Sequence, residues 1–153
     1  MAATVIDSWK LITEIDNYEE VAGVILFRKI FAIAPEAHDL FRFTKEFEPN
    51  SEELFASERL KKHGAGVVST LNIAICMLGT DLEPLVLVLK DLGARHAKYG
   101  VLEAHFPIVG QALIETLADA LGEKFTDDVK AAWVDIYAVV QSNMLAGMKE
   151  ANE

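Results

Sequence analysis

The chain has 153 residues, an apolar share of 52% and a formal net charge of −10. This length suffices for one domain with a substantial core, and the composition excludes a disordered or collagen-like chain. The acidic charge argues against nucleic-acid or anionic-membrane partners, and the single cysteine, Cys76, excludes an internal disulfide. We therefore expect a single domain over residues 1–153.

The sequence also lacks signals for a membrane or for export. No segment has the roughly 18–20 consecutive apolar residues that would cross a bilayer. The N-terminus shows neither a secretory signal nor a myristoylation pattern, because Ala2 stands where myristoylation requires glycine. We expect a cytoplasmic protein without a membrane partner.

Helical periodicity dominates the first third of the chain. Helices are predicted over about residues 4–15 and 18–34, separated by a break at Asp16-Asn17. Pro35 suits the first turn of a new short helix and disfavours continuation of the previous one. Residues 43–55 have no clean period, so a long irregular connection is predicted, of the kind that often lies beside a functional site.

The remainder of the chain is predicted to be helical as well. Gly79 and Gly122 are expected to stop helices, and Thr126 is expected to cap the last one with its hydroxyl group. The predicted helices cover about residues 58–78, 80–98, 103–121 and 126–149. The pattern favours an all-α fold with six or more helices and no strand.

Two histidines lie on apolar helix faces. His63 comes three residues after Leu60 and four before Val67, and His96 comes four residues after Leu92. An unpaired polar group inside a protein costs about 1–3 kcal/mol, so each buried imidazole needs a partner. Taken alone, each histidine is best interpreted as a satisfied core residue, but the pair indicates a shared ligand.

The chemistry of two imidazoles limits what that ligand can be. Two nitrogens do not complete a zinc site, which needs four ligands. They do suit a flat iron macrocycle that fills its own equatorial positions and leaves two axial ones. We expect His38 to be solvated, assign no role to His105, and expect Cys76 to be a small buried residue.

Several segments, taken together and in order, resemble the globin family, in particular its neuroglobin-like intracellular members. Their joint spacing extends over essentially the whole chain, although each fragment alone would be weak. The matching segments are Ser8-Trp9, Pro35, Phe41, Leu60–Val67, Leu92–Val101, Phe106 and Ala131–Tyr137.

The resemblance implies a three-over-three helical sandwich that holds haem b without a covalent bond. His96 matches the proximal iron ligand, and His63 matches the distal histidine that faces the bound ligand or binds iron directly. Phe27, His63 and Val67 match the distal pocket. The expected cofactor-binding residues are Phe41, Phe43, His63, Val67, Leu92, Arg95, His96, Val101 and Phe106. Gly66 departs from neuroglobins, which have a lysine there, so Arg95 and Tyr99 are the expected substitutes for its propionate contact.

The resemblance further implies reversible dioxygen binding for storage or delivery, with carbon monoxide and nitric oxide as other ligands. The alternative is a six-coordinate globin with His63 on the iron and a redox, sensing, nitric oxide or nitrite-converting role. An enzyme is not favoured, and multiple turnovers would need an external reductase. A helical interaction module without haem is a third interpretation. The sequence leaves the oligomeric state open, a homodimer included.

Overall fold

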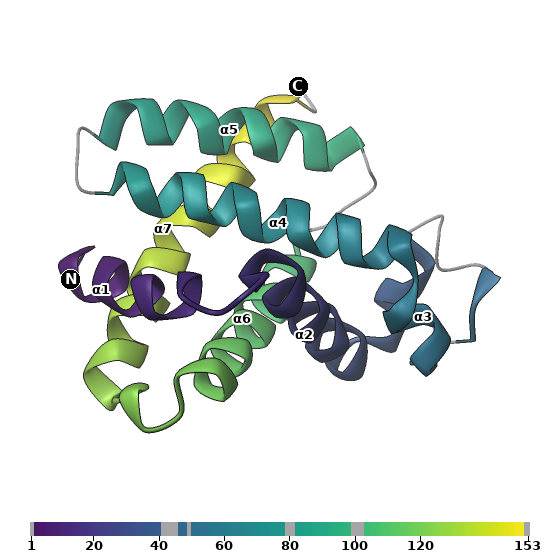
Figure 1. The fold of residues 1–153 in the computed structure, drawn as a ribbon. Helices are drawn as coiled ribbons and strands as arrows, with labels where there is room; N and C mark the ends of the chain where they lie inside the picture. Colours follow the sequence, from purple (N-terminus) through teal and green to yellow (C-terminus); the bar gives the residue numbers. More distant parts are fainter. Residues whose placement is uncertain (1, 41–45, 49, 79–81, 99–102, 152–153) are drawn as a thin grey trace.

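The computed structural model describes residues 2–40, 46–48, 50–78, 82–98 and 103–151, which form helices and contain no strand (Figure 1). The all-α class predicted from the sequence is therefore confirmed. The elements are α1 (Ala2–Thr13), α2 (Tyr18–Ile33), the 3-10 helix η1 (Pro35–Leu40), α3 (Glu52–Ala56), α4 (Glu58–Met77), α5 (Leu82–Lys98), α6 (His105–Leu121), the 3-10 helix η3 (Gly122–Lys124) and α7 (Asp127–Ala151).

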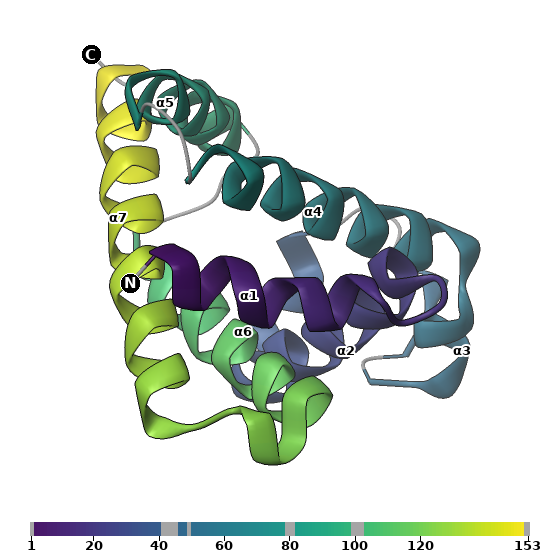
Figure 2. The same ribbon diagram turned by 60° about the vertical axis from the view of Figure 1, so that its left-hand side comes forward.

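The helices form two layers, with α1, α4 and α5 across α2, α6 and α7 (Figure 2). Helix α2 packs mainly on α4 and α6, while α5 packs mainly on α7 near the C-terminal end of that helix. Helices α4 and α5 make few contacts with each other. The three-over-three arrangement expected from the sequence is confirmed, and it leaves α4 and α5 supported by different partners.

Local sequence signals account for most of the helix boundaries. Asn17 adopts a left-handed conformation with φ of 57° and donates a side-chain hydrogen bond to Glu20 at 3.0 Å, which separates α1 from α2. Pro35 begins η1 directly after α2, as predicted. The hydroxyl of Thr126 accepts a hydrogen bond from the amide of Val129 at 3.3 Å, so its expected capping role is confirmed.

The segment expected to be a long irregular connection contains a short helix, α3. The hydroxyl of Ser51 caps it by accepting from the amide of Leu54, and Ser57 caps α4 in the same way at Leu60. Ser51 carries the signal for the extra helix, because it precedes Glu52 and Glu53, two acidic residues that favour a helix start. The expectation of irregular structure over residues 52–55 was wrong for this reason.

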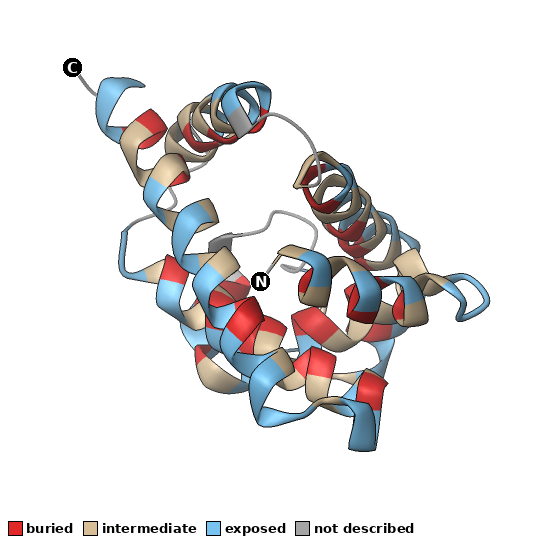
Figure 3. Ribbon diagram, turned by 90° about the vertical axis from the view of Figure 1, so that its left-hand side faces the viewer, coloured by how far each residue is buried: buried red, intermediate tan, exposed pale blue. Residues whose placement is uncertain are grey.

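Two separate groups of buried side chains stabilise the layers (Figure 3). The larger one, the main core, joins α1, α2, α3, α4, α6 and α7 around Trp9, Phe31 and Trp133. The smaller one, which we call the second core, consists of Ala74, Leu85, Leu89, Phe106, Met144 and Met148. The second core lies chiefly between α5 and α7, so α5 is anchored outside the main core.

The two tryptophan side chains of the main core are hydrogen-bonded. The indole of Trp133 donates to the hydroxyl of Ser8 at 2.9 Å, and the indole of Trp9 donates to the side-chain oxygen of Asn72 at 2.8 Å. These bonds connect α1 to α7 and to α4. Both indole N–H groups therefore avoid the free-energy cost of an unsatisfied buried donor.

Two residues have environments opposite to those expected. His38 is buried, with 6% of its surface exposed and its ring edge-on to Phe31 at a centroid distance of 6.0 Å. Cys76 is exposed, as is Ile73 one turn earlier, while Ala74 and Ile75 face inward. Every residue from Ile73 to Met77 is apolar, so periodicity could not show which of them face solvent.

Within the described ranges, no helix is long and apolar enough to span a membrane.

Candidate functional site

His63 projects from the first half of α4 against α2. Its imidazole lies edge-on to the ring of Phe27, with centroids 5.3 Å apart and planes inclined at 64°. The helices can approach this closely because Gly23 and Gly64 meet at the crossing: a Cβ on Gly23 would lie only 2.6 Å from the carbonyl oxygen of Gly64. Gly64, the residue after His63, thus sets the distance between α2 and α4 at which the imidazole of His63 meets Phe27.

The protein around His63 favours a neutral imidazole. The side chain is exposed, contrary to the burial expected from the sequence, but desolvation by the groups around it lowers its pKa below the ordinary value of 6.5. The charge of His96 lowers the pKa further as the second cause. At neutral pH the ring is therefore uncharged, with one N–H donor and one lone-pair nitrogen.

His96 projects from the last two turns of α5 and is half-buried. Its Nδ1 donates a hydrogen bond to the carbonyl oxygen of Leu92 at 2.7 Å. In the neutral ring this bond holds the proton on Nδ1 and leaves Nε2 with the lone pair, which is the arrangement found in metal-binding histidines. The resemblance pointed to the side chain of Leu92, whereas the group that contacts His96 is its carbonyl. The four-residue spacing between Leu92 and His96 is the sequence signal that indicates this bond.

The two imidazoles come from helices with different supports. His63 is on α4, which rests on α2 in the main core, and His96 is on α5, which rests on α7 in the second core. They are near enough for the charge of one to affect the pKa of the other. The sequence pattern paired these two histidines, and their joint role as iron ligands stays a prediction.

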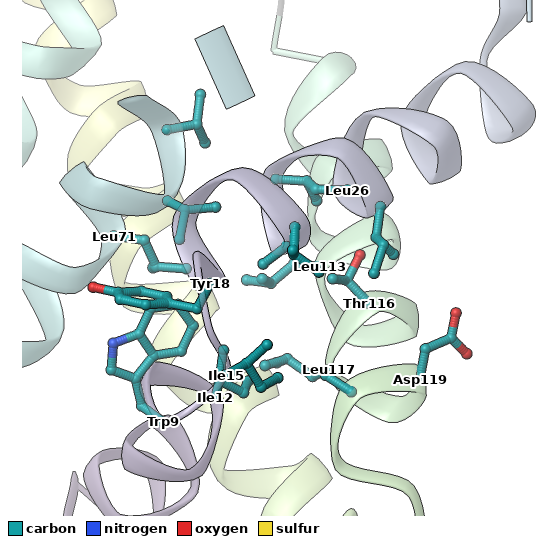
Figure 4. A pocket seen from close by; sticks show the side chains of 16 residues that line it. Trp9, Ile12, Ile15, Tyr18, Leu26, Leu71, Leu113, Thr116, Leu117 and Asp119 are labelled. Atoms are coloured by element: carbon teal, nitrogen blue, oxygen red, sulfur yellow. The ribbon is translucent and has the colours of Figure 1, made fainter. Parts of the chain in front are cut away.

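Val67 lies one turn after His63 and lines a cavity of about 120 Å³ (Figure 4). The wall of this cavity is almost entirely apolar, with side chains from α1, α2, α4 and α6. Trp9, Leu26, Leu71 and Leu113 are among them. Val67 thus lies at the boundary between the main core and the site and offers no hydrogen-bond donor.

Other expected site residues have roles in packing or at the surface. Leu92 packs against the second core, and Phe106 is buried within it. Arg95 is exposed and forms an ion pair with Asp91 at 3.2 Å, one turn earlier on the same helix. Gly66 faces open space, since nothing lies within 4 Å of a Cβ placed there.

The other expected site residues, Phe41, Phe43, Tyr99 and Val101, lie outside the described residues. His105, to which the sequence assigned no role, is half-buried at the start of α6.

Comparisons with known proteins agree with this arrangement. The family model named Globin matches residues 24–144. A neuroglobin from Tetraodon nigroviridis is 31% identical over 131 residues, covering 86% of this chain and 81% of that protein. A protein named as an anaerobic nitrite reductase, from Gossypium hirsutum, is 31% identical over 157 residues, covering 99% and 90% respectively. A second protein named as an anaerobic nitrite reductase, from Brassica napus, is 32% identical over 97% of this chain and 89% of its own length.

The matches extend across both histidine-bearing helices and the two layers that hold them. The fold and the similarity at this level of identity lead to one conclusion. The chain belongs to the globin family and is a haem globin.

Proposed function

We propose that the chain binds dioxygen reversibly on haem b, with His96 as the proximal iron ligand and His63 on the distal side. The observation that supports this most strongly is the hydrogen bond from His96 Nδ1 to the Leu92 carbonyl, because it presents Nε2 as the metal-binding nitrogen. Phe27 adds an apolar wall beside the neutral imidazole of His63. The residues present therefore fit a haem group.

Haem, when bound, would supply an iron that can bind a diatomic ligand. His63 would provide the N–H donor to that ligand. Phe27 and Val67 carry no polar hydrogen, so His63 is the donor among the three expected distal residues. One such hydrogen bond in a dry pocket is worth about 1–3 kcal/mol, or about 5- to 150-fold in affinity. Carbon monoxide carries less charge and gains less from it.

The variant His63→Leu tests this role through the dioxygen dissociation rate. We expect dissociation to be faster by about 5- to 150-fold, with a smaller effect on carbon monoxide. His105→Leu, the same chemical change at the start of α6, is the matched control and should leave both rates unchanged. An unchanged dioxygen dissociation rate in the His63 variant would contradict the assignment.

A second candidate function is nitrite conversion by a form in which His63 itself binds the iron. It is favoured by the names of the two plant relatives. Reduction of nitrite to nitric oxide consumes one electron and two protons and releases water, so an external reductase must supply the electron. The net charge of −10 would favour a basic reductase surface.

The ferrous, ligand-free absorption spectrum separates the two candidates. One broad visible band indicates an open axial position and supports dioxygen binding as the main function. Sharp split bands indicate that His63 is on the iron, in which case ligands must displace it and the apparent affinity falls by the fraction of open protein. In that case His63→Leu would speed ligand capture.

A further inference from the structure

Helices α5 and α7 touch through their backbones at two points. A Cβ placed on Gly93 would overlap the carbonyl oxygen of Met144 and lie 2.7 Å from its carbonyl carbon. A Cβ on Gly147 would overlap the carbonyl oxygen of Lys90 in the same way, also 2.7 Å from the carbonyl carbon. Because backbone atoms cannot rotate aside, any side chain at either glycine must separate the two helices.

The two contacts are reciprocal and lie close to His96. Gly93 packs on Met144, which lies one turn before Gly147, and Gly147 packs on Lys90, which lies one turn before Gly93. The two contacts therefore belong to a single helix crossing. His96 follows Gly93 by three residues on α5, and Leu92, whose carbonyl orients the imidazole, is the neighbour of Gly93. The crossing therefore fixes the backbone that carries both His96 and its hydrogen-bond acceptor.

Side chains around the crossing strengthen the attachment of α5 to α7. Met144 and Met148 pack with Leu85 and Leu89 in the second core. At the outer edge, Lys90 pairs with Glu150 at 3.2 Å. Since α5 has few contacts with α4, its position relative to the rest of the fold depends mainly on α7.

We propose that Gly93 and Gly147 are positioning residues for the proximal imidazole, and that the α5–α7 crossing sets how far His96 reaches toward the iron. This inference rests on the proposed role of His96. The distal imidazole is held by a different crossing, that of Gly23 with Gly64, so the two axial positions are set by two independent helix pairs. A change at Gly147 moves His96 without altering any residue of α5.

The variant Gly147→Ala tests the proposal, with Ser142→Ala on the same helix as the control. Ser142 is exposed, so its truncation leaves the crossing unchanged, whereas a methyl group at Gly147 must displace α5. Both changes are made in the His63→Leu background, so that the iron to His96 stretching frequency can be read by resonance Raman spectroscopy. We expect a shifted frequency for Gly147→Ala, because displacement of α5 changes how far His96 reaches toward the iron. We expect hemin transfer to a haem-scavenging protein to be faster by about tenfold, which corresponds to about 1.4 kcal/mol.

The outcomes separate this inference from the proposed function. Unchanged frequency and hemin transfer in a folded Gly147→Ala variant would overturn the positioning role, even if its unfolding midpoint falls. If the unaltered protein takes up no hemin, this result would instead refute the proposed function.

Hydrogen exchange of the unaltered apoprotein keeps the proposal testable if Gly147→Ala does not fold. The crossing predicts that the amides of α5 are protected together with those of α7, without haem. Unprotected α5 amides beside protected α7 amides would show that α7 does not hold α5 and would overturn the inference.

Discussion

The imidazole of His63 rests edge-on against the ring of Phe27, and this contact joins the candidate site to the main core. Phe27 is 3% exposed and also contacts Phe31, with ring centroids 5.8 Å apart. One face of the distal side is thus built from tightly packed aromatic rings. Interiors packed this densely do not readily close around a deleted side chain.

Replacing Phe27 with alanine should lower the free energy of unfolding by about 3–5 kcal/mol, because it leaves a cavity between α2 and α4. Urea unfolding of the apoprotein measures the change. Val21→Ala is the control on the same helix, since Val21 is 41% exposed and its truncation should cost at most about 0.5 kcal/mol. Equal losses for the two variants would contradict the packing described for Phe27.

The bond between Trp133 and Ser8 should also be measurable. Ser8→Ala leaves the buried indole N–H of Trp133 without its acceptor, so we expect a loss of about 1–3 kcal/mol in unfolding free energy. Repeating Ser8→Ala in a Trp133→Phe background removes the donor as well. The loss should then be smaller, and an identical loss in both backgrounds would show that the hydrogen bond contributes nothing.

Much of this fold could be predicted from the sequence because its boundary signals are local. Asn17, Pro35, Gly122 and Thr126 each act through their own backbone or hydroxyl chemistry, and the structure has helix boundaries at all four. The pairing of His63 with His96 rests on a related sequence signal and stays a prediction. Both stand on apolar stripes where a polar ring needs a partner.

What could not be predicted depends on tertiary contacts. The burial of His38 arises from its contact with Phe31 on another element, and the exposure of Cys76 from the way one uniformly apolar helix turn faces its neighbours. The crossing of Gly93 with Gly147 joins residues far apart in the chain. A lone glycine in a helix indicates low helix propensity at that position, but it does not identify which backbone segment packs against it.

Exposure of the single cysteine leads to a further prediction. Cys76 should react with Ellman's reagent in the native protein at a rate close to that in denaturant, because its side chain is exposed. The measurement is a stopped-flow absorbance trace of the released thiolate. A thiol that reacts only after unfolding would restore the buried role expected from the sequence.

The ion pair between α2 and α3 should make a small, pH-dependent contribution. The hydrogen bond from Arg28 to Glu52, and then the positive charge of Arg28, lower the pKa of this exposed carboxyl below its ordinary 4.5. The ionised carboxylate therefore stabilises the folded chain above that value, and the contribution is lost as the pH falls through the folded-state pKa. Arg28→Met should return the pKa of Glu52 toward 4.5 in an NMR titration. No change in that pKa would contradict the pairing.

The proposed attachment of the iron to the protein depends above all on His96 as its ligand. Hemin titration of the unaltered apoprotein and of His96→Gly is the first half of the most direct test. In the second half, both proteins carry His63→Leu and are reduced, and their absorption and resonance Raman spectra are recorded with and without added imidazole. We predict that the unaltered chain develops a Soret band, that His96→Gly loses the iron–histidine vibration, and that imidazole restores it. A chain that stays colourless with hemin, or a His96→Gly variant with unaltered proximal coordination, would contradict the account.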